Sequence, residues 1–120
     1  MANSSLAVRI LPETERSLAF GSILASPTYT KVGGPLLYAS VQLIFQNLTD
    51  GIIKFSWDGI NPAFTLNATT SFILDVQSNK GRGEALMAGQ GTQFWVAYAT
   101  APTQGTVYIS SLYSAEFSNI

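Results

Sequence analysis

Residues 50–59, with the sequence DGIIKFSWDG, decide the fold. Between the two Asp-Gly steps, Ile53, Phe55 and Trp57 alternate with three residues that belong to the opposite face. A period of two residues is the pattern of a β-strand. Glycine after aspartate supplies the positive φ that tight turns require. The stretch therefore predicts a short strand with a hairpin-type turn at each end.

The same pattern continues on both sides of this stretch. Short alternating runs recur between Gly, Pro, Asn and Asp residues, and no segment keeps a period of 3.6 residues. The expected strands are residues 6–11, 39–47, 52–57, 63–66, 70–76, 85–87, 92–100 and 106–113. Seven or eight short strands predict an all-β fold, an antiparallel β-sandwich of the jelly-roll kind.

The alternation also predicts which side chains form the core. Within each expected strand, the large apolar residues fall on one face, and that face is expected to point inward. The predicted core residues are Leu43, Phe45, Ile53, Phe55, Trp57, Phe72, Leu74, Phe94, Val96, Tyr98, Val107 and Ile109.

The N-terminal part is less regular than the rest. Residues 17–32 are small and apolar without clear alternation, and Gly33-Gly34-Pro35 breaks the chain after them. We therefore expect residues 1–34 to form an extended arm with a first strand, and residues 35–120 to form the β-sandwich domain. Fully extended, the arm could reach ~100 Å. Its apolar residues would need a partner surface, and the candidates are Leu18, Phe20, Ile23 and Leu24.

The chain is unusually poor in charge. Charged residues make up 11% of the 120 residues and the net charge is −1, whereas 36 residues are Ser, Thr, Asn or Gln. Residues 32–49 and 85–115 carry no charge at all. Typical soluble domains are about 25% charged. Because interface cores are depleted in charge, this composition favours a surface that contacts other subunits. A surface that is merely polar and uncharged remains the alternative.

Composition argues against an enzyme. The chain has no cysteine and no histidine, so it lacks thiolate ligands, the commonest general base and the commonest metal ligand. A serine activated by Lys31, Lys54 or Lys80 is conceivable, but no spacing recommends one of them. The seven acidic residues form no obvious catalytic pair. We expect no catalytic site and no cofactor.

Two binding alternatives rest on particular side chains. Asp58, Asn61, Asp75 and Asn79 carry oxygens of the kind that calcium prefers, but no loop resembles an EF-hand, so no metal site is expected.

The aromatic residues of the strands could instead form a platform for sugars. Trp57, Trp95, Tyr98, Tyr108 and Tyr113 are the candidates. Large aromatic side chains in apolar strands more often fill a core or a subunit interface. We therefore assign Trp95 and Tyr108 to partner binding.

The ends and the charge of the chain bear on its location. The first residues lack the basic and apolar regions of a secretory signal, which predicts synthesis in a cytoplasm. No apolar run is long enough for a membrane helix. The near-zero net charge gives no general attraction to nucleic acid or to a membrane.

From residue 41 onward, the chain resembles small β-rich structural proteins of tailed bacteriophages. The similar stretches are FQNLTD at 45–50, FSWDG at 55–59, LDVQSNK at 74–80, GT at 91–92, and AP with GTVY within 101–108. The resemblance covers about two thirds of the chain and concerns turns and strands rather than a catalytic motif. It implies a virion component made in the host cytoplasm, either a capsid decoration (cement) protein or a part of the head-to-tail neck.

The partners that this resemblance implies are capsid or neck subunits and further copies of the chain. The alternative is a glycan-binding β-sandwich displayed on a virion or a fibre. A third possibility, a minor enzyme subunit, is disfavoured by the missing histidine and cysteine.

Overall fold

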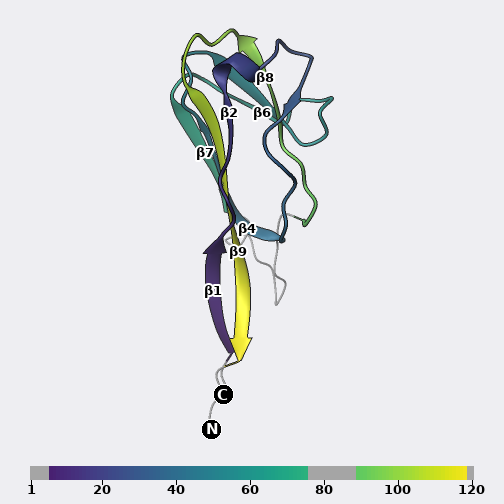
Figure 1. Cartoon of the computed structure of the whole chain (residues 1–120), viewed down its shortest axis with the longest axis vertical. Helices are drawn as coiled ribbons and strands as arrows, with labels where there is room; N and C mark the ends of the chain where they lie inside the picture. The colour runs from purple at the N-terminus through teal and green to yellow at the C-terminus, as the bar shows by residue number, and fades with distance from the viewer. Residues whose placement is uncertain (1–5, 76–88, 119–120) are drawn as a thin grey trace.

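The computed structural model describes residues 6–75 and 89–118, with side chains for residues 10–75 and 89–113. The described chain forms two antiparallel β-sheets that pack face to face (Figure 1). The five-stranded sheet contains β1 (Leu6–Pro12), β2 (Arg16–Ala19), β4 (Ser40–Asn47), β7 (Thr70–Asp75) and β9 (Thr106–Ser118). The four-stranded sheet contains β3 (Thr30–Lys31), β5 (Ile52–Ser56), β6 (Phe64–Leu66) and β8 (Trp95–Thr100). A single 3₁₀ turn, η1 (Phe20–Ser22), follows β2.

The strand order is that of a jelly roll. The sheets read β1-β9-β4-β7, with β2 also on β9, and β3-β8-β5-β6. Strands therefore pair in a nested series: β1 and β2 with β9, β3 with β8, β4 with β7, and β5 with β6. This is the arrangement of one long hairpin that is wrapped around a core, with β5 and β6 at its closed end. The predicted all-β sandwich is confirmed.

The first Asp-Gly step does not form the expected hairpin. Strands β4 and β5 lie in different sheets, so the turn between them crosses the sandwich. Buried Asn47 holds this corner, because its Nδ2 donates to the carbonyls of Gly51, Leu66 and Asn67 at 3.0–3.1 Å. Its Oδ1 accepts from the amide and the hydroxyl of Thr49. The second Asp-Gly step does lie in a hairpin loop, between β5 and β6.

The core fills the space between the sheets as the alternation predicts. Of the predicted residues, Leu43, Phe45, Ile53, Phe55, Phe94, Val96, Val107 and Ile109 are buried. Leu74 and Tyr98 are partly buried and pack against this cluster. Trp57 and Phe72 are more exposed than predicted, at 39% and 40%. Phe72 lies on β7, the edge strand of its sheet, and Trp57 lies just beyond the end of β5.

The N-terminal segment belongs to the sandwich instead of forming a separate arm. Strand β2 pairs with β9, and β3 pairs with β8. Ile23 and Val32 are buried among the core residues of both sheets. Sequence alternation is weak here because the strands are only four and two residues long, too short to display a period.

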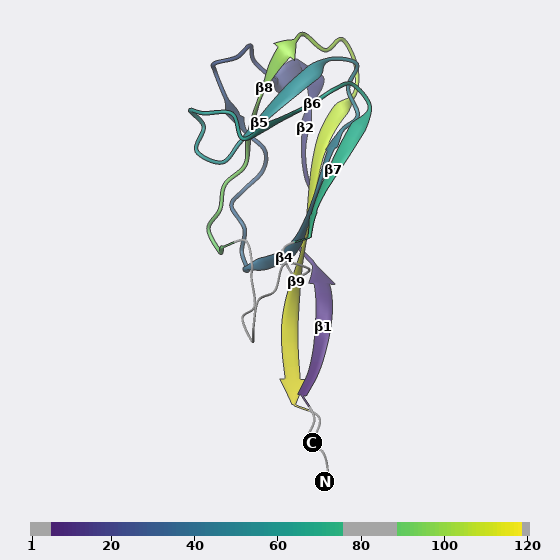
Figure 2. The same ribbon diagram turned by 180° about the vertical axis from the view of Figure 1, so that it is seen from behind.

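Strands β1 and β9 continue past the sandwich as a two-stranded ribbon. Their register runs from Pro12 opposite Leu112 to Leu6 opposite Ser118. Figures 1 and 2 show this ribbon projecting from the body along the long axis. Leu6 and Ser118, the first and last described residues, pair at its tip. The predicted strand at residues 6–11 is confirmed, and the last strand is longer than predicted. The expected strand at 85–87 lies outside the described residues.

Candidate interaction surface

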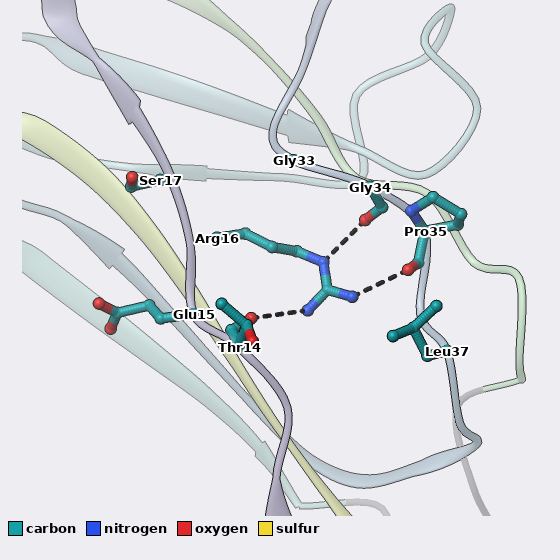
Figure 3. A pocket seen from close by; sticks show the side chains of 8 residues that line it. All are labelled: Thr14, Glu15, Arg16, Ser17, Gly33, Gly34, Pro35 and Leu37. Atoms are coloured by element: carbon teal, nitrogen blue, oxygen red, sulfur yellow. Dashed lines mark hydrogen bonds between the residues drawn. The ribbon is translucent and has the colours of Figure 1, made fainter.

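A buried arginine anchors the chain where the ribbon meets the sandwich. Figure 3 shows Arg16 reaching from β2 across a shallow pocket to the segment that follows β3. Its Nε donates to the carbonyl of Gly34 at 2.7 Å, and one terminal nitrogen donates to that of Pro35 at 2.9 Å. The other terminal nitrogen donates to the hydroxyl of Ser111 at 3.2 Å. With its donors satisfied inside the chain, Arg16 serves as a structural cross-brace rather than as a ligand-binding cation.

Glu13 completes this brace. Its carboxylate lies 2.9 Å from Arg16 and accepts the amides of Leu37 and Tyr38 at 3.2 and 3.0 Å. Burial raises the pKa of Glu13, but the hydrogen bonds from Arg16 and from the two amides outweigh that effect and hold it below its usual value. We call Glu13 and Arg16 the clamp, because together they fix residues 34–38 against the start of the ribbon.

The clamp presents exposed apolar side chains beside the ribbon. Leu37 is 64% exposed and Tyr38 is 50% exposed, although their backbone amides are held firmly. The ring of Tyr38 stacks on that of Tyr113 in β9, with centroids 4.1 Å apart. Ile10 in β1 is also half exposed, but it lies opposite Ser114 and so points to the other face of the ribbon from Tyr113. We call Leu37 and Tyr38 the base patch. No sequence signal pointed to it, because the amides that place it bond to a side chain more than 20 residues away.

A second surface, with an uncharged centre, covers the outside of the five-stranded sheet. Alternate residues of β7, β4 and β9 face outward here, and they are only partly buried or exposed, so no described layer covers them. Ile73, which is 58% exposed, lies opposite Ile44 on the adjacent strand. We call this surface the outer sheet face. Its central residues are Gln42, Ile44, Gln46, Ser71, Ile73, Tyr108, Ser110 and Leu112. Two acidic residues border it: Asp75 lies opposite Gln42, and Glu15 accepts a hydrogen bond from the hydroxyl of Ser110 at 3.0 Å.

The apolar residues predicted to bind partners from the N-terminal segment fall in two environments. Ile23 is 4% exposed and Leu18 packs against the core, so the domain itself covers their apolar surface. Phe20 and Leu24 are exposed at 39% and 51%, on and just after η1. These two remain available to a partner, away from the ribbon.

The two aromatic residues predicted to bind partners also separate. Trp95 is half-buried: a Cβ on Gly59 would lie 2.9 Å from its ring, and Lys31 Nζ lies 5.4 Å from the ring centroid. Trp95 therefore supports the β5–β6 loop. Tyr108 is part of the outer sheet face, opposite Gln46 and Ser17 on the flanking strands. The structure thus does not gather the six predicted residues into one site.

The predicted calcium alternative gains no geometric support. One Asp58 oxygen accepts the amides of Ile60 and Asn61 at 2.8 Å, and the hydroxyl of Ser56 also bonds to it. These bonds hold the pKa of Asp58 well below its usual range. Asn79 lies outside the described residues. Among the residues that the structure describes, no three histidine, cysteine or acidic side chains are grouped as metal ligands would be.

The described part of the chain also contains no helix of the length and apolarity needed to cross a membrane. Comparisons with protein-family models, with curated proteins and with solved structures give no match. Any functional assignment therefore rests on the surfaces of the chain itself.

Proposed function

We propose that the protein is a non-enzymatic structural subunit of a symmetric assembly, and specifically of a bacteriophage virion. Within the virion it would be a capsid decoration (cement) protein or a component of the head-to-tail neck. Its partners would be capsid or neck subunits and further copies of itself, and it would be made in the host cytoplasm before assembly.

The outer sheet face carries this proposal. It spreads over three adjacent strands and places Ile44 beside Ile73 in an uncharged centre, with Asp75 and Glu15 at its borders. Interface cores are depleted in charge, whereas free surfaces of small domains are commonly about 25–35% charged. A face with an uncharged, partly apolar centre is suited to contact with another protein.

The acidic side chains support a structural role. Glu13, Asp50 and Asp58 each accept backbone amides and thereby fix a loop. Asp50 ties the β4–β5 corner to Thr103 in the β8–β9 loop, accepting from both its amide and its hydroxyl. These three carboxylates accept hydrogen bonds within the chain and fix its loops. A chain with fixed loops is suited to the role of a rigid subunit.

The fold adds support by analogy only. Jelly rolls form viral capsid domains and also lectin domains, so the strand order suits both the proposed function and the glycan-binding alternative. The resemblance of residues 41–120 to phage structural proteins favours the virion.

Sedimentation of the purified chain tests the proposal. We expect wild type to form a defined oligomer, and Ile73→Lys to weaken it because a charge would enter the outer sheet face. Thr65→Lys is the matched control, since Thr65 is exposed on β6 in the other sheet. An oligomer equally unaffected by both variants would contradict the role of the face. A strictly monomeric chain that binds glycans would favour the alternative. Electron microscopy of the native particle would then locate the subunit.

A further inference from the structure

We propose that the β1–β9 ribbon joins two copies of this chain, by antiparallel pairing of β1 with β1 of a second copy about a two-fold axis at Val8. The inference deepens the proposed function and rests on it for the larger assembly, because it names one contact by which copies are linked.

The ribbon is placed to reach a neighbour. Seven residue pairs join β1 to the far half of β9, which corresponds to about 23 Å of strand. The whole chain measures 59 × 24 × 22 Å, and the ribbon lies along the long axis (Figure 2). Among the described residues, β1 pairs with no strand other than β9. One backbone edge of β1 is therefore open over its whole length within the described chain.

Backbone alternation identifies the groups on this open edge. The amide of Glu13 donates to the carbonyl of Ser111 at 3.0 Å, which marks these residues as a hydrogen-bonded pair. In an antiparallel ladder such pairs alternate with non-bonded pairs. Stepping back along β1, the odd-numbered residues direct their N–H and C=O groups to β9. The even-numbered residues Leu6, Val8, Ile10 and Pro12 direct theirs outward.

Pro12 marks where the open edge ends. Proline has no N–H group, and within sheets it is found on edge strands where that group would face away from the ladder. Its position in β1 agrees with the alternation above. The donors available on the open edge are thus the amides of Leu6, Val8 and Ile10, and they are centred on Val8.

The open edge is complementary to itself in one register. With the two-fold axis at Val8, Val8 pairs with its own copy and Leu6 pairs with Ile10. All three are hydrogen-bonding positions, so the joint would contain roughly six hydrogen bonds. An axis at Arg9 would instead place two arginines opposite each other and Leu6 opposite Pro12. That register adds like-charge repulsion and loses a donor.

Pairing with a second copy would also stabilise the ribbon. An isolated two-stranded ribbon is marginally stable in water, whereas three or more strands can be stable. Two copies would produce a four-stranded sheet in the order β9-β1-β1-β9. The self-complementary edge makes a second copy the natural occupant, because a two-fold contact uses the same patch on both chains. The antiparallel arrangement brings the tip of each ribbon to the base of the other copy's ribbon.

Cysteine cross-linking tests the register directly, because the chain has no cysteine of its own. In the Val8 register, residues at position 8 face each other with Cα atoms about 5.5 Å apart, within the range for a disulfide. Residues at position 9 are offset by two positions and lie roughly 8 Å apart. We therefore expect full-length Val8→Cys to form a covalent dimer with diamide, and the matched control Arg9→Cys to form far less. Equal cross-linking of both variants, or of neither, would overturn the register.

A backbone variant tests the joint itself. Val8→Pro removes an outward amide without removing a bond to β9, and Val8→Thr keeps that amide. In sedimentation, we expect Val8→Pro to lose the two-fold contact and Val8→Thr to retain it, with equal thermal melts showing that both sandwiches fold. If Val8→Pro sediments as wild type, the joint is wrong. If that variant and wild type still share an oligomer that Ile73→Lys disrupts, the proposed function stands and only the ribbon joint fails.

Discussion

The aromatic centre of the sandwich gives the sharpest test of the fold, through the substitution Phe45→Ala. Phe45 is fully buried on β4, between β7 and β9. Its ring centroid lies 5.1–6.1 Å from those of Phe55, Trp57, Phe64, Phe72 and Phe94. A buried Phe→Ala change costs about 3–5 kcal/mol, and the cost rises where the cavity cannot collapse. Because strands pair on both sides of β4, we expect about 4–5 kcal/mol here.

Urea titration at constant pH measures this loss. For a small protein the slope is about 1–3 kcal/mol/M, so with a slope near 2 the midpoint should fall by roughly 2 M. The matched control is Phe72→Ala, which removes the same atoms from a ring that is 40% exposed, and it should cost about half as much. Far-UV circular dichroism should be followed beside tryptophan fluorescence, because Trp57 touches the altered site. A midpoint shift for Phe45→Ala no larger than that for Phe72→Ala would refute the assigned core.

Three further perturbations test the parts around this centre. Glu13→Gln should lower the free energy of unfolding by ~2–3 kcal/mol, because it leaves buried Arg16 without a counter-charge. The folded pKa of Glu13 lies below the ordinary value of 4.5, so its contribution to the free energy of unfolding is complete above pH 4.5 and is lost as the pH falls toward the folded pKa. Acid titrations of wild type should therefore show a loss of stability in this range that Glu13→Gln does not show. Gly105→Ala should lower the free energy of unfolding by more than about 2 kcal/mol, because φ is +100° and the new Cβ would lie 2.1 Å from a backbone oxygen. The control, Gly21→Ala, has open space around it and should change stability by less than about 0.5 kcal/mol in the same titration. Deleting residues 1–34 should abolish cooperative thermal unfolding, because the deletion removes three strands and two core residues; a truncated chain that still melts cooperatively would show that the segment is dispensable.

The inward face could be predicted because strand periodicity depends only on local sequence. Ile53 and Phe55 were placed correctly from alternation within a six-residue run. Pairing between strands could not be predicted in the same way, and Asp50-Gly51 shows why. The dipeptide permits a tight turn, but the buried Asn47 side chain bonds across both sheets and directs the chain over to the other one. That choice depends on residues almost 20 positions apart.

The candidate surfaces were harder to predict than the core. Ile73 carried a usable signal, because it is an apolar residue on the otherwise polar side of an alternating strand. Leu37 and Tyr38 carried none, since Glu13 fixes their position from a distant part of the chain. An extended arm, as the sequence predicts, would place Leu18 and Ile23 against a partner. In a nested hairpin fold, the first strands must return to the last ones, so these apolar residues find their partners within the domain.

The nested fold also explains why the first and last strands, β1 and β9, meet in the ribbon. In a wrapped long hairpin, the closed end at β5 and β6 lies in one sheet, and the open end carries the first and last strands, β1 and β9, together. Any length of those strands beyond the core must either fray or pair. The clamp lies at this boundary and fixes the ribbon base through buried contacts to β9 and to residues 34–38. Pairing with a second ribbon then needs no change in the sandwich, so the outer sheet face can contact other subunits independently.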